Sequence, residues 1–172
     1  MALVFADAGW DSTDTAVLWA NTSTGTPAQD TSIKYNGRGS IKCDSGAGNA
    51  ATGTLMPQNG RLVMRRRFSS LPSADTGIIQ VVDSSGATAV FTLRLRTTGK
   101  LRFGSSTQNG SDSATAVQVD TWYRISVAWS VVSISVNVLK VWIDGNLEIT
   151  ETNFALDNAS PGRLNAGWTA AP

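Results

Sequence analysis

The sequence predicts an all-β domain, a two-sheet antiparallel β-sandwich or jelly roll, and three observations carry the prediction. Apolar and polar residues alternate with a period of two over several segments, most clearly over residues 89–103. Turn residues rich in Gly, Asn, Asp and Ser separate about a dozen short β-prone runs at intervals of roughly 8 to 12 residues. No window shows the 3.6-residue apolar period and the capping residues of a helix.

Residues 89–103 form the clearest predicted hairpin. The intervening polar residues, which include three arginines, are expected on the opposite side of the strands from the apolar set. A turn at 97–100 contains Gly99 and separates the two strands. The side chains predicted to face the core are Phe91, Leu93, Leu95, Leu101 and Phe103.

Two further strands follow the same rule. Residues 120–129 place Tyr123 and Trp129 on one face with two β-branched residues, so we expect Trp129 in the core. Residues 133–144 place Leu139, Val141 and Ile143 inward, which puts Trp142 on the outer or concave side. This strand ends at an Asp-Gly turn, and residues 147–150 are predicted to return from it as the next strand.

The N-terminal half gives a weaker signal of the same kind. Its runs are short, β-prone and bounded by turn residues such as Asn36-Gly37 and Asn59-Gly60. We find no repeat, linker or low-complexity tract, so one domain over residues 1–172 is expected. The predicted strands here are 2–5, 16–19, 32–35, 40–43, 53–56, 62–68 and 77–82.

Composition excludes several classes of function. The formal net charge is +1, so no global field draws the chain toward nucleic acid or an anionic membrane. The single cysteine, Cys43, allows no intrachain disulfide. The N-terminus lacks the basic region and apolar run of a signal peptide, and no apolar stretch is long enough to span a membrane. We therefore expect a soluble protein that is made in the cytoplasm.

Several segments resemble the concanavalin A-like lectin/glucanase superfamily, particularly its laminin-G-like members. The segments occur in the order typical of that superfamily, with a W-Y-R-I strand before a V-x-I-D-G strand and hairpin. The opening FAD at 5–7 and the closing GRLNAG at 162–167 also fit. The matching segments are RLVMRRRFSSLP at 61–72, LRLRTTGKLRF at 93–103, TWYRISVAW at 121–129 and VWIDG at 141–145.

The resemblance implies a jelly roll with one sheet curved enough to leave a concave side, where relatives hold glycans or protein partners. Many bacteriophage virion proteins look similar. We therefore expect a non-enzymatic virion accessory protein, a capsid (head) decoration or tail surface protein, with major capsid or tail proteins as partners and the virion as its location. It is expected to form a homo-oligomer, with a trimer as the working guess. The alternative is a carbohydrate-binding module or an adhesin for host-surface glycans.

The residues that catalysis would need are largely missing. A glycoside hydrolase needs two carboxyl groups facing one cleft, whereas Glu148 and Glu151 are three residues apart and are expected on opposite faces of their strand. The chain has no histidine, which excludes Ser-His-Asp and Cys-His sites and removes the commonest zinc ligand. We therefore predict no catalytic residues and no enzyme.

The binding candidates are aromatic and basic. Sugars stack on exposed aromatic faces, which makes Trp10, Trp142 and Tyr123 the candidate ligand residues. Arg65 and Arg67 are expected to point away from the core face. Together with the arginines at positions 94, 96 and 102 they would form one positive stripe for an acidic partner. A solvated face is the more common role for any single arginine.

Calcium is the one metal that the resemblance suggests, because laminin-G-like domains often bind it at a loop rim. Asp83, Asp112, Asp144 and Asp157 supply the oxygen ligands that calcium prefers. Local turn chemistry also explains aspartate at such positions, and we favour this explanation over calcium binding. No cofactor and no metal site is therefore predicted.

Overall fold

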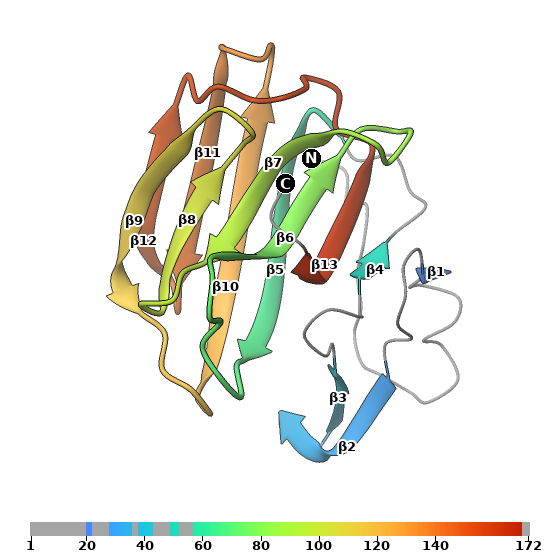
Figure 1. Ribbon diagram of the computed structural model, residues 1–172, viewed down its shortest axis with the longest axis vertical. Coiled ribbons are helices and arrows are strands. Elements are labelled where there is room, and N and C mark those ends of the chain that lie inside the picture. The colour runs from blue at the N-terminus through green and yellow to red at the C-terminus, as the bar shows by residue number, and fades with distance from the viewer. Residues whose placement is uncertain (1–19, 22–27, 36–37, 43–48, 52–56, 170–172) are drawn as a thin grey trace.

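The computed structural model describes residues 20–21, 28–35, 38–42, 49–51 and 57–169, and the side chains of 57–165. This part of the chain is all-β, with two antiparallel sheets packed face to face and a separate two-stranded ribbon (Figure 1). The predicted fold class, a jelly-roll β-sandwich, is therefore confirmed. No helix suited to crossing a membrane occurs among these residues.

The larger sheet has seven strands and lies in front of the smaller one in Figure 1. All of its pairs are antiparallel. In spatial order its strands are β1 (Ala20–Asn21), β4 (Asn49–Ala51), β13 (Arg163–Thr169), β6 (Thr76–Val82), β7 (Ala89–Leu95), β8 (Lys100–Gly104) and β9 (Asn109–Ala116).

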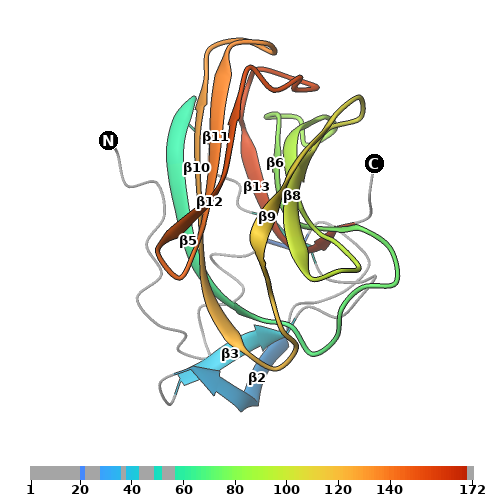
Figure 2. The ribbon, with the colours of Figure 1, turned by 90° about the vertical axis from the view of Figure 1, so that its left-hand side faces the viewer.

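The smaller sheet has four strands, in the order β12 (Asn146–Thr152), β11 (Asn137–Ile143), β10 (Trp122–Val131) and β5 (Asn59–Arg67). Figure 2 shows the two sheets edge-on, with the ribbon of β2 (Ala28–Tyr35) and β3 (Arg38–Lys42) at one end of the sandwich. At one margin of the sandwich, β12 of the smaller sheet lies beside β9 of the larger one.

The core lies between the sheets and is built by the predicted alternation. The five apolar side chains of the 89–103 hairpin are all fully buried, and Phe91 meets Phe103 edge-on with ring centroids 5.7 Å apart. From the smaller sheet, Ile125, Val127 and Trp129 of β10 complete this layer. Burial of apolar side chains on two facing sheets is the main driving force for this fold.

Trp129 is in the core, as predicted, at 4% exposure. Its indole N–H donates to the carbonyl oxygen of Pro57 at 2.9 Å, so its one polar atom is satisfied. The ring lies against Gly60, its partner on β5, where an added Cβ would come within 2.3 Å of it. Gly60 is therefore required to make room for the tryptophan.

Three predicted strands lie wholly outside the described residues, and the other predictions match with small shifts. The strand predicted over 133–144 begins only at Asn137, because Ser133 Oγ accepts the N–H groups of Ser135 and Val136 and holds a turn there. The segments outside the described residues are 2–5, 16–19 and 53–56; Cys43 lies outside them too.

β9 is a strand that alternation did not predict. Its sequence, NGSDSATA, contains no large apolar residue. Its fully buried position is Ser113, whose Oγ accepts the N–H of Leu101 and donates to the carbonyl of Thr115. Hydrogen bonding to β8, and not apolar patterning, therefore holds this strand in the sheet.

Candidate functional site

The outer surfaces of the two sheets differ in chemistry. We call the outward side chains of the seven-stranded sheet around Thr92 and Arg94 the polar face. We call the outward side chains of the four-stranded sheet around Trp142 the tryptophan face. The two faces lie on opposite sides of the sandwich (Figure 2).

A row of polar residues crosses the polar face from strand to strand. Asn165 of β13, Gln80 of β6 and Thr92 of β7 are successive cross-strand partners. Asn165 donates to Gln80 Oε1 at 3.2 Å, and Gln80 donates to Thr92 Oγ1 at 3.4 Å. Thr92 is fully buried although it points outward from the core. The row is therefore an ordered, sheltered network and not a solvated surface.

Arg94 lies beside this row and is held in one position. It is 9% exposed, donates from Nη1 to Asn109 Oδ1 and from Nη2 to the carbonyl of Ser105, both at 3.2 Å. Its guanidinium lies across Gly104, where an added Cβ would come within 2.6 Å of the guanidinium carbon. Since burial removes water from the charge, it lowers the pKa of Arg94, and nearby Arg102 lowers it further.

Two more arginines and two aspartates extend the polar face. Arg102 is the cross-strand partner of both Arg94 and Asp112. Arg102 Nη2 lies 2.7 Å from Asp75 Oδ2, and Arg96 Nη1 lies 2.5 Å from Asp112 Oδ2. The pairing with Asp112 also raises the pKa of Arg96. These four side chains are 18% to 30% exposed, so a ligand can reach them.

The hydrogen-bonding capacity of this network is not exhausted. The Nε atoms of Arg94, Arg96 and Arg102 and the Oδ1 atom of Asp112 are shielded from solvent and have no hydrogen-bond partner. Buried polar atoms are normally paired with protein or with ordered water. Arg96 Nε also lies 3.4 Å from Asp75 Oδ2, so it is held by an ion pair. Because these atoms are enclosed, a ligand would meet the exposed parts of Arg96, Arg102, Asp75 and Asp112 instead.

The tryptophan face is built from small residues in the middle and large ones beside them. On β10, Ser126 and Ala128 point outward, and Ser126 pairs with Val63 of β5 and with Trp142 of β11. The guanidinium of Arg61, the partner of Ala128, therefore reaches across to lie 4.8 Å from the centre of the Trp142 ring. Trp142 points outward, as predicted, and is half-buried.

The other two candidate aromatics differ in outcome. Tyr123 packs against the core, because it shares the inner side of β10 with Ile125. Its hydroxyl oxygen accepts the N–H of Gln118 at 3.0 Å. Tyr123 is therefore not part of an outer binding face. Trp10 lies outside the described residues.

The predicted single arginine stripe is wrong. Arg65 and Arg67 pair with Arg124 and Trp122 on the four-stranded sheet, whereas Arg94 and its neighbours belong to the seven-stranded sheet. The two groups point away from each other on opposite sides of the sandwich. Alternation shows which side of a strand a residue occupies, but it does not show which sheet the strand joins.

The expected divergence of Glu148 and Glu151 is also wrong. A register shift beside Trp142 leaves Glu148 out of the strand pairing, and both glutamates reach the backbone of β9. Glu148 accepts the N–H and the hydroxyl of Thr115, and Glu151 accepts the N–H of Ser111. Four residues of strand, about 13 Å, separate these contacts. That exceeds the spacing of a hydrolase carboxylate pair.

The aspartates considered for calcium are each used in contacts with the protein, but only those of Asp83 lie within one turn, and Asp112 pairs with Arg96. Asp83 Oδ1 accepts the hydroxyl of Ser85 at 2.6 Å and the N–H of Ala87 at 3.2 Å. Asp144 accepts the N–H of Arg124 at 2.7 Å, and Asp157 accepts the N–H of Ser106 at 2.8 Å. Within the described part of the chain, no three metal-binding side chains gather in one place.

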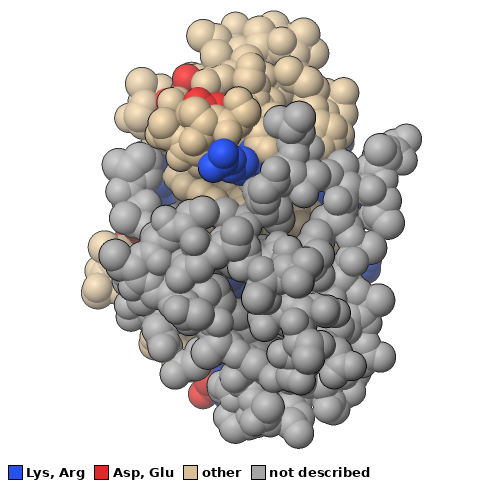
Figure 3. Space-filling view, turned by 90° about the vertical axis from the view of Figure 1, so that its right-hand side faces the viewer, with Lys and Arg blue, Asp and Glu red and all other residues tan. Residues whose placement is uncertain are grey.

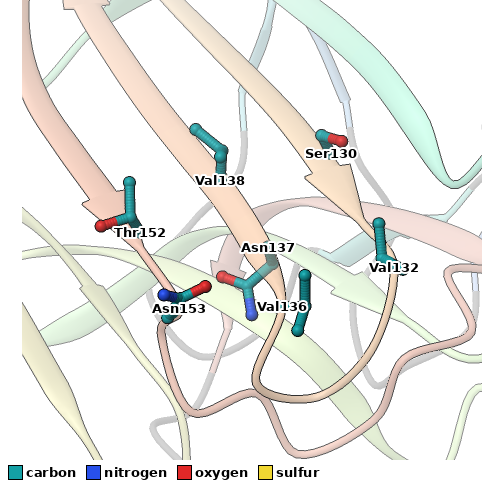
Figure 4. A pocket seen from close by; sticks show the side chains of 7 residues that line it. All are labelled: Ser130, Val132, Val136, Asn137, Val138, Thr152 and Asn153. Atoms are coloured by element: carbon teal, nitrogen blue, oxygen red, sulfur yellow. The ribbon is translucent and has the colours of Figure 1, made fainter.

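A pocket of about 260 Å³ lies at the end of the tryptophan face (Figure 4). Val132, Val136 and Val138 give it an apolar lining, and Ser130 and Thr152 supply hydroxyl groups. No charged side chain lines it. The side of the molecule in Figure 3 shows one compact basic area below acidic atoms, with scattered basic atoms at the margins of the view. The pocket and this basic area both offer fewer ordered polar groups than the polar face does.

No protein-family model matches the chain, and no curated protein matches it. Several solved structures share its fold. An endo-β-1,4-glucuronan lyase from Trichoderma reesei has a TM-score of 0.59 at 16% identity, and the match covers 94% of this chain and 79% of the lyase. The sialidase of Trypanosoma rangeli gives 0.59 at 14% identity, over 86% of this chain but 24% of the sialidase.

A third similar structure is a separate domain of an enzyme. Domain 4 of AbnA, an extracellular arabinanase from Geobacillus stearothermophilus, was solved with arabinotriose and has a TM-score of 0.54 at 17% identity. The match covers 88% of this chain and 76% of that domain. At these identities the likeness concerns the fold. The chain therefore shares the jelly-roll sandwich fold of these structures.

Proposed function

We propose that this protein is a carbohydrate-binding domain and that its polar face holds the glycan. One observation carries the proposal: an ordered hydrogen-bonded network crosses the outside of the seven-stranded sheet, where a merely structural surface would be solvated. Thr92 and Arg94 form its buried centre, and Gln80, Arg102 and Asn165 remain half-buried around them.

The chemistry of the polar face suits sugar hydroxyl groups. Each hydroxyl both donates and accepts, and the face offers amide, guanidinium and carboxylate groups side by side. The groups are held in place before binding by contacts such as Gln80 with Thr92 and Arg102 with Asp75. A ligand therefore finds fixed partners, and less side-chain freedom is lost when it binds.

The similar structures agree with this proposal. One of them is a domain with arabinotriose bound, and another is a lyase named for a glucuronan. We assign binding and no reaction to the polar face, since the chain has no histidine and its described glutamates are engaged at β9.

The proposal is tested by a glycan array followed by titration of the strongest ligand. We expect saturable binding to a defined oligosaccharide. Gln80→Ala removes the central amide of the row and should weaken binding about tenfold, the loss of one or two well-placed hydrogen bonds. Thr150→Ala is the matched control, because Thr150 is exposed on the opposite sheet.

Two results would count against this assignment. If no glycan binds saturably, the proposed function is wrong. If a glycan binds but Thr150→Ala weakens it and Gln80→Ala does not, the function stands and the site lies on the other face. Thermal melting of each variant checks that the fold is intact.

The virion role expected from the sequence stays a prediction, as do the trimer and the single domain over 1–172. A carbohydrate-binding domain can serve on a bacteriophage head or tail as an adhesin, so the two roles are compatible. Co-sedimentation with assembled particles tests the virion role. Light scattering after gel filtration tests the trimer.

A further inference from the structure

We propose that the tryptophan face docks onto an acidic protein surface that also presents apolar side chains. This goes beyond glycan binding, because it concerns the opposite side of the sandwich. Three observations carry it: the cations of this face, the placement of the nearby acids, and an exposed apolar row through Trp142.

The cations come from three of the four strands. Alternation along β5, β10 and β11 turns five basic side chains outward, and Arg65 and Arg124 are direct cross-strand partners. Arg61 and Lys140 both flank Ala128. Among the described residues, no carboxylate pairs with Arg61, Arg124 or Lys140. The basic residues of the face are Arg61, Arg65, Arg67, Arg124 and Lys140.

The acids near this face offset only part of its charge. Glu148 and Glu151 of the neighbouring strand β12 both turn to the backbone of β9. Asp120 pairs with Arg67 at 2.7 Å, and Asp144 caps the N–H of Arg124. Among the described side chains, Arg61, Arg124 and Lys140 therefore keep charges that no ion pair offsets. A partner of negative charge would complement them.

A row of three apolar side chains, interrupted by the buried Ser126, runs through the middle of these cations. Val63, Ser126, Trp142 and Leu147 are successive partners across all four strands. Val63 is 46% exposed and Leu147 is 54% exposed. A tryptophan at the centre, aliphatic neighbours and a rim rich in arginine are typical of protein interfaces.

This arrangement favours a protein over other partners. A nucleic acid or an acidic polysaccharide would match the cations but would leave the aliphatic side chains of Val63 and Leu147 without apolar contacts. A second copy of the chain, placed face to face, would bring two sets of like charges together. An acidic protein with apolar side chains satisfies both features.

The test uses a random copolymer of glutamate and tyrosine as the acidic, apolar-bearing probe, with poly-glutamate as its comparison. Fluorescence anisotropy of the labelled polymers measures binding. We expect the copolymer to bind more tightly than poly-glutamate, and more weakly as salt rises. The double variant Arg61→Gln/Lys140→Gln should weaken both about tenfold. Trp142→Ala should remove the preference for the copolymer.

Lys100→Gln supplies the control, because it removes one charge from the other sheet and should leave binding unchanged. The inference is overturned if the polymers do not bind, or if Lys100→Gln weakens binding as much as the double variant does. It is also overturned if heparin, duplex DNA or anionic vesicles bind better than the copolymer and lose binding in the same variants. If the protein self-associates and Trp142→Ala abolishes that self-association, the partner of this face is a second copy of the chain and the inference is overturned.

Discussion

At the scale of single residues, Gly104 decides how Arg94 lies on the polar face. The guanidinium crosses the sheet at the place where any other residue would put its Cβ. Alternation predicted that Arg94 points away from the core, and it does. It could not predict that Arg94 is 9% exposed, because that depends on Gly104 and Asn109 from two other strands.

We expect Gly104→Ala to lower the free energy of unfolding by about 1 to 3 kcal/mol. The new methyl group would lift the guanidinium from its contacts with Ser105 and Asn109. Urea unfolding of Gly104→Ala, Arg94→Ala and the double variant measures the coupling between the two positions. A double variant whose loss equals the sum of the single losses would show that the two residues do not interact.

At the scale of elements, alternation predicted most strands that bury several apolar side chains, and it did not predict β1, β4, β9 or β13. β7, β8 and β10 lie where alternation predicts them. β9 was missed because its inward residue, Ser113, is held by hydrogen bonds. The shift of β12 that brings Glu148 to β9 was missed too, because a bulge arises from pairing with the neighbouring strand.

The two hairpin glycines should differ in how well they tolerate alanine. Gly99 and Gly145 both have positive φ, at 80° and 93°, so alanine costs each about 1 kcal/mol in backbone conformation. At Gly99 the new Cβ would also come within 2.6 Å of the carbonyl oxygen of Val117, whereas nothing lies within 4 Å at Gly145. We expect Gly99→Ala to be the more destabilising by at least about 1 kcal/mol in thermal or urea unfolding. Equal losses would contradict this packing.

The contact of Glu148 with β9 should make stability depend on pH. Burial acts to raise the pKa of Glu148, but hydrogen bonds from the Thr115 N–H and hydroxyl outweigh it and hold the pKa below its ordinary value of 4.5. The stabilisation is therefore complete above pH 4.5 and is lost as pH falls through the folded-state pKa. Glu148→Gln should show a smaller fall in urea midpoint between about pH 7 and about pH 3 than the wild type. An identical fall would contradict this.

At the scale of the whole molecule, the sandwich separates two kinds of surface. Predicting this separation requires knowing which strands share a sheet, and short-range alternation carries no such information. Arg65 and Arg102 both face outward, as the pattern indicates, yet one belongs to the tryptophan face and the other to the polar face. For the same reason Trp142 could be selected from the sequence as an outward aromatic, while the network of Gln80, Thr92 and Asn165 could not.

Because the hydrophobic core lies between the two faces, the proposed glycan and protein sites should act independently. We expect Arg61→Gln/Lys140→Gln to leave glycan affinity unchanged within about twofold, and Gln80→Ala to leave copolymer binding unchanged, since distant sites without shared contacts are usually additive. Titration of each ligand in the presence of the other measures this directly. A change of tenfold or more in either affinity, about 1.4 kcal/mol of coupling, would mean that one ligand reaches both faces or that the sheets shift on binding.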